Sequence, residues 1–255
     1  MAERNIKLVL AYDGTDFCGW QIQKEQRTVQ GELTRALEQM HKHPVTVTAA
    51  GRTDTGVHAR GQVVNFLTDL DSIPGSRFRD AVNFYLPADI SVLASREAPP
   101  EFNARFSARR RVYRYYTVIS PVHLPHVCRY AARRRSYPDL RRLNRMAALL
   151  RGEQNFATFA AAGDSSRSKY RNVYSAQFYM EGRQLVFKIA ADAFLYRMVR
   201  SLVGTILELH DNGRDRREFQ SILEAGERKQ AGTTAPARGL FLEKVYYGDE
   251  ADFFA

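Results

Sequence analysis

The sequence predicts an α+β protein built from two ferredoxin-like halves, each with the element order β-α-β-β-α-β. Short runs of alternating apolar residues indicate strands, and between them lie segments whose apolar residues recur every three or four positions, which indicate helices. The same succession of elements occurs twice in 255 residues, a length that suffices for two small domains. We place the halves at 1–108 and 109–255, with a single irregular α+β domain as the alternative.

The first half is expected to begin with a strand, because apolar residues alternate from Ile6 to Tyr12 before the turn Asp13-Gly14. A helix is expected from Val29 to Met40, where apolar residues stand at helical spacing and Pro44 follows. The remaining predicted elements of this half are two strands within 45–67 joined by a loop at 51–61, a helix at 78–86 and a strand at 90–94.

The second half repeats this order. Its predicted elements are a strand at 112–119, a helix from Asp139 to Leu150, a hairpin of strands at 173–180 and 184–191, helices at 195–209 and 217–225, and a strand at 240–247. Two such halves are expected to form one continuous, mainly antiparallel sheet with helices on one face. Arginines near the junction would then line a central basic cleft on the open face.

Positive charge is concentrated in one part of the chain. There are 38 Lys and Arg residues against 28 Asp and Glu, a net charge of +10. Block 101–150 contains 12 Arg and only two acids, Glu101 and Asp139, so it carries the whole excess. Guanidinium groups pair with phosphate through two parallel hydrogen bonds and stack on bases. The block therefore predicts a polyanionic partner, nucleic acid above all, with a solvated, ion-paired surface as the alternative.

Composition excludes several classes of protein. Hydrophobic residues make up 44% of the chain, too many for a disordered tail, and no apolar run approaches the roughly 18 residues of a membrane span. The first residues lack the pattern of a secretory signal. We therefore expect a globular cytoplasmic protein that does not contact membranes, with Cys18 and Cys128 as reduced thiols.

The loop at 51–58 gathers the groups that catalysis needs. Its sequence is Gly-Arg-Thr-Asp-Thr-Gly-Val-His, which places one guanidinium, one carboxylate and one imidazole around closely spaced glycines. Glycines allow backbone to approach a ligand or another segment closely. Asp54 is therefore the candidate catalytic group, and a plain Asx-turn with Arg52 and His58 in solvent is the alternative.

This loop resembles the Gly-Arg-Thr-Asp-x-Gly-Val-His signature of the tRNA pseudouridine synthase A family. Other stretches similar to that family follow in the same order, and the resemblance runs from about residue 6 to 247. They are Tyr12-Asp13-Gly14, Gly19-Trp20-Gln21, Thr28-Val29-Gln30, Phe102 to Ala108 with Tyr113-Arg114-Tyr115, Phe194 to Arg200 with Val203-Gly204, and Ala235 to Leu240.

The resemblance implies the pseudouridine synthase fold, a homodimer, and isomerisation of uridine to pseudouridine in the anticodon stem-loop of tRNA, at positions 38, 39 and 40. The product is an isomer of the substrate, so no cofactor and no metal are expected. Asp54 would attack the anomeric carbon, add to uracil C6, or take a ribose proton to give a glycal. Arg200 would keep Asp54 ionised, and Tyr113 would stack on the target base.

The residues themselves leave alternatives open: Arg200 as a solvent-facing residue of an amphipathic helix, and Tyr113 as part of the core. Arg52 is expected to help extrude the target base from the stem. By the same resemblance, Leu240 would line the uracil pocket. His58 is expected to support the site from behind. The other candidates for binding the substrate are Gln21 in a polar loop at 21–27, Arg171 in a second polar loop at 165–171, and Arg109, Arg110 and Arg111. Either loop could instead be a solvated linker.

Arg133, Arg134 and Arg135 match no motif of the family and are expected to belong to a solvated face. Two other functions are alternatives to this one. A non-catalytic RNA-binding protein would stack bases on sheet aromatics but would not need the Asp54 loop. A metal-dependent nuclease would need clustered carboxylates, which the loop lacks. The group His123, His126 and Cys128 falls short of the four ligands of a structural zinc site.

Overall fold

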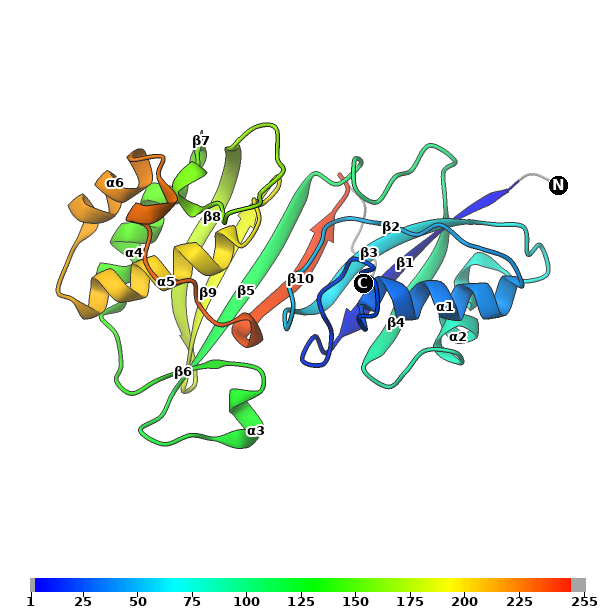
Figure 1. The fold of residues 1–255 in the computed structure, drawn as a ribbon, viewed down its shortest axis with the longest axis horizontal. Coiled ribbons are helices and arrows are strands. Elements are labelled where there is room, and N and C mark those ends of the chain that lie inside the picture. The colour runs from blue at the N-terminus through cyan, green and yellow to red at the C-terminus, as the bar shows by residue number, and fades with distance from the viewer. Residues whose placement is uncertain (1–2, 249–255) are drawn as a thin grey trace. The chain divides into compact units, whose positions relative to one another are not determined.

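The computed structural model of the chain describes residues 3–248, which fall into two compact units (Figure 1). The first unit holds the chain up to Arg109 and again from Leu242, and the second holds Arg110–Phe241. The class is α+β, as predicted, with mostly antiparallel strand pairs. The end of the last strand, which the sequence placed with the second half, belongs to the first unit.

The first unit is built around β1 (Arg4–Tyr12), which lies between β3 (His58–Thr68) and β4 (Ile90–Ala98) and is antiparallel to both. The order of these three strands is β4-β1-β3, and the short β2 (Thr48–Ala49) pairs with β3 beside this path. Because β1 is central, its residues 5–10 are all buried. The sheet therefore offers a rigid base for the loop that connects β2 to β3.

Two helices lie side by side against this sheet, α1 (Val29–His41) and α2 (Phe78–Asn83), the latter after the 3₁₀ turn η1 (Gly75–Arg77) (Figure 1). The Thr28 side chain accepts a hydrogen bond from the Gly31 N–H and so begins α1. Lys42, with a φ of 63°, ends it in the left-handed conformation. The predicted helix at 29–40 is thus confirmed.

The second unit has β5 (Arg110–Ile119), β9 (Gln184–Ala191), β8 (Tyr170–Glu181) and β7 (Gly152–Asn155) as successive antiparallel neighbours. β6 (Ala132–Arg134) runs parallel to β5. The other elements are α3 (Pro125–Cys128), α4 (Leu140–Ala147), α5 (Met198–Asp211), α6 (Arg216–Glu224) and four 3₁₀ turns, η2 (Ala148–Leu150), η3 (Ala157–Phe159), η4 (Arg228–Gln230) and η5 (Ala237–Gly239). The last strand, β10 (Leu240–Tyr246), begins in this unit.

The structure differs from the prediction at several element ends. The β-branched stretch from Val45 pairs as a strand only at Thr48–Ala49. Helix α5 begins at Met198 rather than at 195, because Arg197 has a φ of 59° and lies in the left-handed region. Strands β6 and β7 and helix α3 were not predicted, since none shows an extended apolar pattern. Within residues 3–248, no helix has the length and hydropathy needed to cross a membrane.

Candidate functional site

The loop that carries Asp54 is held by the segment that follows β1. The Tyr12 hydroxyl and the Thr53 hydroxyl are 2.8 Å apart and share a buried hydrogen bond. The Trp20 N–H donates to the Thr53 carbonyl at 3.0 Å, and the Gly56 N–H donates to the Phe17 carbonyl at 3.3 Å. Thr53 and Gly56 flank Asp54, so its backbone is fixed on both sides.

Glycines make this close approach of two backbones possible. A Cβ atom on Gly14 would lie 2.0 Å from the Val57 carbonyl oxygen, and one on Gly19 would lie 2.7 Å from the Thr53 carbonyl oxygen. Gly19 also has a φ of 83°, which other residues rarely adopt. The glycines near the end of β1 are therefore required by contact with the loop, and not only by turns of their own.

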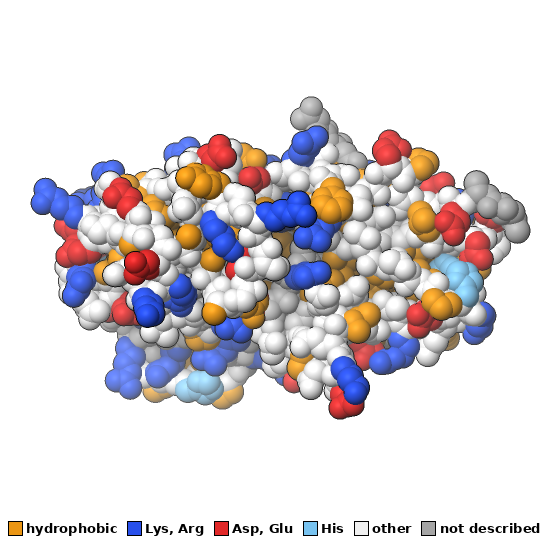
Figure 2. Space-filling view, turned by 45° about the horizontal axis from the view of Figure 1, so that its top comes forward, with side chains coloured by type: hydrophobic (Ala, Val, Ile, Leu, Met, Phe, Trp, Pro, Cys, Tyr) orange, Lys and Arg blue, Asp and Glu red, His pale blue; other side chains and the backbone are white. Residues whose placement is uncertain are grey.

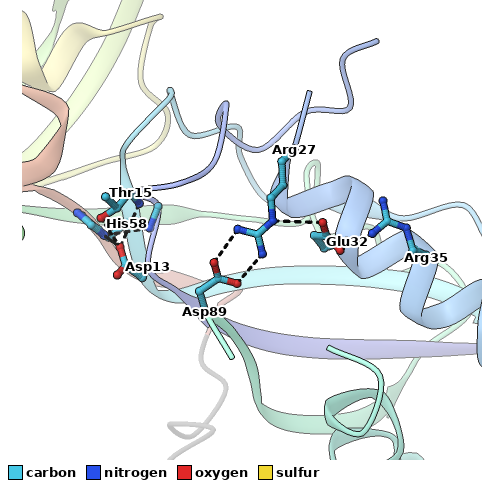
Figure 3. A network of polar contacts seen from close by, with 8 residues as sticks. Asp13, Thr15, Arg27, Glu32, Arg35, His58 and Asp89 are labelled. Carbon is cyan, nitrogen blue, oxygen red and sulfur yellow. Dashed lines mark hydrogen bonds and ion pairs between the residues drawn. The ribbon is translucent and has the colours of Figure 1, made fainter. Parts of the chain in front are cut away.

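His58 closes the loop from behind. It is buried, with no exposed surface, and its Nδ1 accepts a hydrogen bond from the Gly14 N–H at 3.0 Å. The Asp13 carboxylate lies 3.2 Å from the same nitrogen and accepts hydrogen bonds from the Thr15 N–H and hydroxyl (Figure 3). The imidazole thus binds the backbone turn at Asp13-Gly14, so any influence of His58 on a bound substrate passes through the loop.

Asp54 itself is half-buried on this clamped loop, and Arg52, two residues earlier, is exposed. The Val57 N–H donates to the Asp54 carbonyl at 3.1 Å, which forms a turn directly after the carboxylate. A carboxylate on fixed backbone, with an exposed guanidinium close by in the chain, is an arrangement that can act on a ribose whose phosphate is also bound.

The polar loop at 21–27 is fastened at its far end by Arg27. This guanidinium makes two hydrogen bonds to the Asp89 carboxylate, at 2.7 and 2.9 Å, and lies 3.3 Å from Glu32 (Figure 3). The negative charges of Asp89 and Glu32 raise the pKa of Arg27 above its usual value. The guanidinium also covers the Phe17 ring at 4.2 Å. Gln21, at the other end of the loop, is exposed.

In the second unit, Tyr113 lies in β5 opposite Ile189 of β9. Its side chain is 8% exposed, and its ring meets that of Phe194 edge to face at 5.0 Å between centroids. Leu240, at the start of β10, is 6% exposed. Both are thus packed residues with a small exposed surface.

Arg200 lies in the first turn of α5, where its Nε donates to the Ala235 carbonyl at 2.8 Å. The Ala235 N–H donates back to the Arg200 carbonyl at 3.1 Å. Arg200 is therefore a half-buried, positioned guanidinium and not a fully solvated one.

The other candidate arginines differ in how far they are exposed to solvent. Arg109 and Arg110 are exposed, whereas Arg111 is half-buried and donates to the Asp192 carbonyl. Arg171 is half-buried and donates to the Ser168 carbonyl at 2.9 Å, and burial lowers its pKa. Figure 2 shows Lys and Arg side chains, in blue, at the surface of the second unit.

One anchoring residue was not foreseen. The Asp164 side chain is 4% exposed, pairs with Lys169, and accepts a hydrogen bond from the Tyr196 N–H at 2.6 Å. Burial would raise the pKa of Asp164, but Lys169 and the N–H groups of Tyr196 and Ser166 outweigh it and lower this pKa to about 2. The polar loop after Asp164 is thus tied to the chain just before α5.

The prediction for Arg134 was wrong. Its side chain is 12% exposed and donates from Nη1 to Asp211 at 3.0 Å and from Nε to the Ser136 carbonyl at 2.8 Å. Arg133 and Arg135 are exposed, as expected. Cys128 is buried, and in the described part of the chain no three His, Cys, Asp or Glu side chains form a group that could hold a metal ion.

Comparison with known proteins gives consistent matches along most of the chain. The family model described as tRNA pseudouridine synthase matches residues 8–107 and 146–248. A tRNA pseudouridine synthase A from Treponema denticola is 46% identical over 97% of this chain and 94% of its own length. Relatives of the same name from Halalkalibacterium halodurans and Anoxybacillus flavithermus are 44% and 43% identical, over 93% and 96% of this chain and 90% and 99% of their own lengths.

Proposed function

Because the chain belongs to the tRNA pseudouridine synthase family, we propose that it isomerises uridine to pseudouridine in the anticodon stem-loop of tRNA, at positions 38, 39 and 40. Isomerisation of uridine in tRNA is the reaction of the family as a whole. The observation that carries the proposal is the loop around Asp54, whose backbone is held by Trp20 and Phe17. Asp54 is the proposed catalytic residue.

The reaction exchanges one bond for another without a net change of atoms. The bond between ribose C1′ and uracil N1 breaks, the uracil turns, and a bond forms between C1′ and C5. The proton on C5 is lost and N1 gains a proton. A carboxylate serves each route to this exchange, as a nucleophile at C1′ or C6 or as a base toward a ribose proton, so Asp54 must be ionised and held still.

A uridine within a stem must leave the base stack before any group can reach its ribose, which costs a few kcal/mol. Arg52 is exposed and stands two residues before Asp54. Its guanidinium is proposed to bind the phosphate of the extruded nucleotide, because paired charge offsets the cost of unstacking. Gln21 directly follows Trp20, whose N–H donates to the Thr53 carbonyl. Gln21 is proposed to contact the same strand of the RNA.

The second unit is proposed to supply the remaining groups. Tyr113 offers a buried ring with a small exposed surface, suited to stacking on uracil, and Leu240 offers an apolar wall. Arg200 is proposed to keep the carboxyl pKa of Asp54 low, because an opposite charge at short range favours the ionised form. Its hydrogen bond to the Ala235 carbonyl supports this role by limiting its rotamers.

Release of tritium from tRNA that carries 5-tritiated uridine tests the function directly, because the C5 proton is lost in every route. We expect release by the wild-type protein and at least a thousandfold slower release by Asp54→Asn, with tRNA affinity retained. Asp71→Asn, on an exposed residue of the same unit, is the matched control and should release tritium at the wild-type rate. Equal rates for Asp54→Asn and wild type would remove Asp54 from the mechanism.

Two further expectations belong to this proposal. The protein is proposed to work as a cytoplasmic homodimer, in which one tRNA contacts both protomers and so meets twice the arginine surface. Sedimentation at micromolar concentration checks the oligomeric state, with twice the 29.1 kDa mass of the chain as the expected result.

A further inference from the structure

The second unit contains a groove that none of the proposed catalytic residues lines. Its volume is about 990 Å³, and its walls are α5 from Gly204 to Asp211 with Asn212 after it, the chain from Ala132 to Tyr137, and the segment 233–238. Neither Tyr113 nor Arg200 lines it. Eight residues of helix at about 1.5 Å each give this wall a length of about 12 Å.

The acidic side chains of the groove are already engaged by the protein. Glu208 accepts a hydrogen bond from the Thr233 N–H at 2.9 Å. Asp211 is paired with Arg134, whose Nη1 lies 3.0 Å from it. Burial would raise the pKa of Asp211, but Arg134 and His210 outweigh it and hold this pKa below its usual value. Both carboxylates therefore help to hold the walls of the groove in place.

Two of the basic side chains are not engaged in this way. Arg135 and Arg238 are exposed groove residues, and among residues 3–248 neither guanidinium makes a hydrogen bond or ion pair. Tyr137, on the same wall as Arg135, is 64% exposed. With Asp211 paired to Arg134 and Glu208 bonded to the Thr233 N–H, the groove still presents two guanidinium groups and one aromatic ring, the combination that binds a nucleic acid strand by phosphate pairing and base stacking.

The segment 235–238 is fixed in place, because α5 and β5 both donate hydrogen bonds to its backbone. Arg200 donates to the Ala235 carbonyl at 2.8 Å, and the Tyr115 hydroxyl donates to the Pro236 carbonyl at 2.8 Å. On α5, a Cβ atom on Gly204 would lie 1.8 Å from the Thr233 carbonyl oxygen, so only glycine lets helix and segment approach this closely. The guanidinium of Arg238 is therefore carried by a preorganised backbone.

We propose that this groove binds the sugar-phosphate backbone of the tRNA substrate beyond the nucleotide that is isomerised, with Arg135 and Arg238 on phosphates and Tyr137 against a base. The proposal rests on tRNA as the substrate and not on the identity of the catalytic residues. From Arg200 to Asp211 α5 rises about 17 Å, the axial length of about five stacked nucleotides. A strand held near Arg200 can thus extend along the groove.

The test measures the affinity of unmodified tRNA across a range of salt concentrations. For the double variant Arg135→Gln/Arg238→Gln we expect affinity about tenfold weaker and a salt slope smaller by about two, one for each lost phosphate contact. Arg145→Gln/Arg151→Gln removes the same charge from exposed positions of the same unit outside the groove and should leave the slope unchanged. Arg135→Lys/Arg238→Lys retains the charge and should keep the slope, and it also reports on whether the fold is intact.

Tyr137→Ala is expected to weaken binding several-fold at every salt concentration, and Tyr137→Phe to bind as the wild type does. In tritium release, the Gln double variant should raise KM and leave kcat at saturating tRNA unchanged. A slope equal to that of the control pair would overturn the proposal, as would equal losses in both pairs. Absence of tritium release by the wild type would instead count against the proposed function, while the binding result would stand.

Discussion

At the scale of single residues, the Asp54 loop depends on atoms that a sequence pattern does not show. Tyr12 and Thr53 are 41 positions apart, yet their hydroxyls share a buried hydrogen bond. His58 contributes to the same arrangement by accepting from the Gly14 N–H. The residue next to the carboxylate is thus fixed by hydrogen bonds from the first strand. Preorganisation of this kind lets a single carboxylate act without moving at the moment of reaction.

Gly14 gives the sharpest test of this clamp. In Gly14→Ala the new Cβ would lie 2.0 Å from the Val57 carbonyl oxygen, so the two backbones must separate. We expect a loss of about 2 kcal/mol in the free energy of unfolding by urea, together with a lower kcat in tritium release.

Gly51→Ala is the matched control, because a Cβ atom there meets nothing within 4 Å. Its stability should equal or slightly exceed that of the wild type, since alanine restricts the unfolded chain. A Gly14→Ala protein as stable as Gly51→Ala would show that the contact between the two segments is not tight.

At the scale of elements, helices with both periodic apolar residues and terminal signals were predictable. Helix α1 has apolar residues at helical spacing, with Thr28 before it and Pro44 after it. Each of these signals depends only on residues a few positions away in the chain. The predicted strand from Val45 was largely wrong because β-branched residues favour a buried extended chain whether or not it pairs. The partner strand decides pairing, and the local sequence does not contain it.

The same reason explains what was missed in the second unit. Arg134 was expected in solvent, but its partner Asp211 stands 77 positions further along the chain. Asp164 was not singled out because its partner, the Tyr196 N–H, belongs to another segment. The proposal of Asp54 as the catalytic group, by contrast, rests on eight consecutive residues. The sequence thus predicts features that depend on neighbouring residues, and it does not predict contacts between segments that are distant in the chain.

The contacts of Asp164 with Lys169 and the Tyr196 N–H predict that the stability of the protein depends on pH. Its pKa is about 2 in the folded protein, against 3.8 for an unperturbed group. A lowered pKa means that the ionised carboxylate stabilises the fold above pH 4, and that this contribution is lost as the pH falls toward 2. We expect Asp164→Asn to be less stable than wild type by about 1–2 kcal/mol at pH 6, since the pair with Lys169 is partly open to solvent.

Urea unfolding at a series of pH values checks this expectation. The difference between wild type and Asp164→Asn should shrink steadily below pH 4 and nearly vanish at pH 2. Asp71→Asn, on an exposed residue, should follow the wild-type curve. A difference that stays constant from pH 6 to pH 2 would mean that the side chain stabilises the loop by its shape and not by its charge.

At the scale of the whole molecule, the net charge is +10. The arginines behind this excess are of two kinds, those that hold the fold together and those that reach solvent. Arg111 and Arg134 donate to Asp192 and Asp211 and so belong to the fold. Arg109 and Arg110 are exposed at the start of β5. Only arginines whose guanidinium can reach a phosphate release counterions when tRNA binds. The block 101–150 should therefore contribute less to RNA affinity than its count of arginines suggests.

This division predicts unequal effects within one run of three arginines. Arg109→Gln/Arg110→Gln should weaken tRNA binding and reduce the slope of log affinity against log salt by about two, because two phosphate contacts are lost. Arg111→Gln should leave the slope nearly unchanged and lower the midpoint of thermal unfolding instead, because it removes a half-buried donor to Asp192. Binding titrations at four salt concentrations, with thermal unfolding of the same samples, measure both quantities. An unchanged slope in the double variant would show that these two side chains face away from the RNA, and the charge excess of the block would then act on tRNA through other arginines.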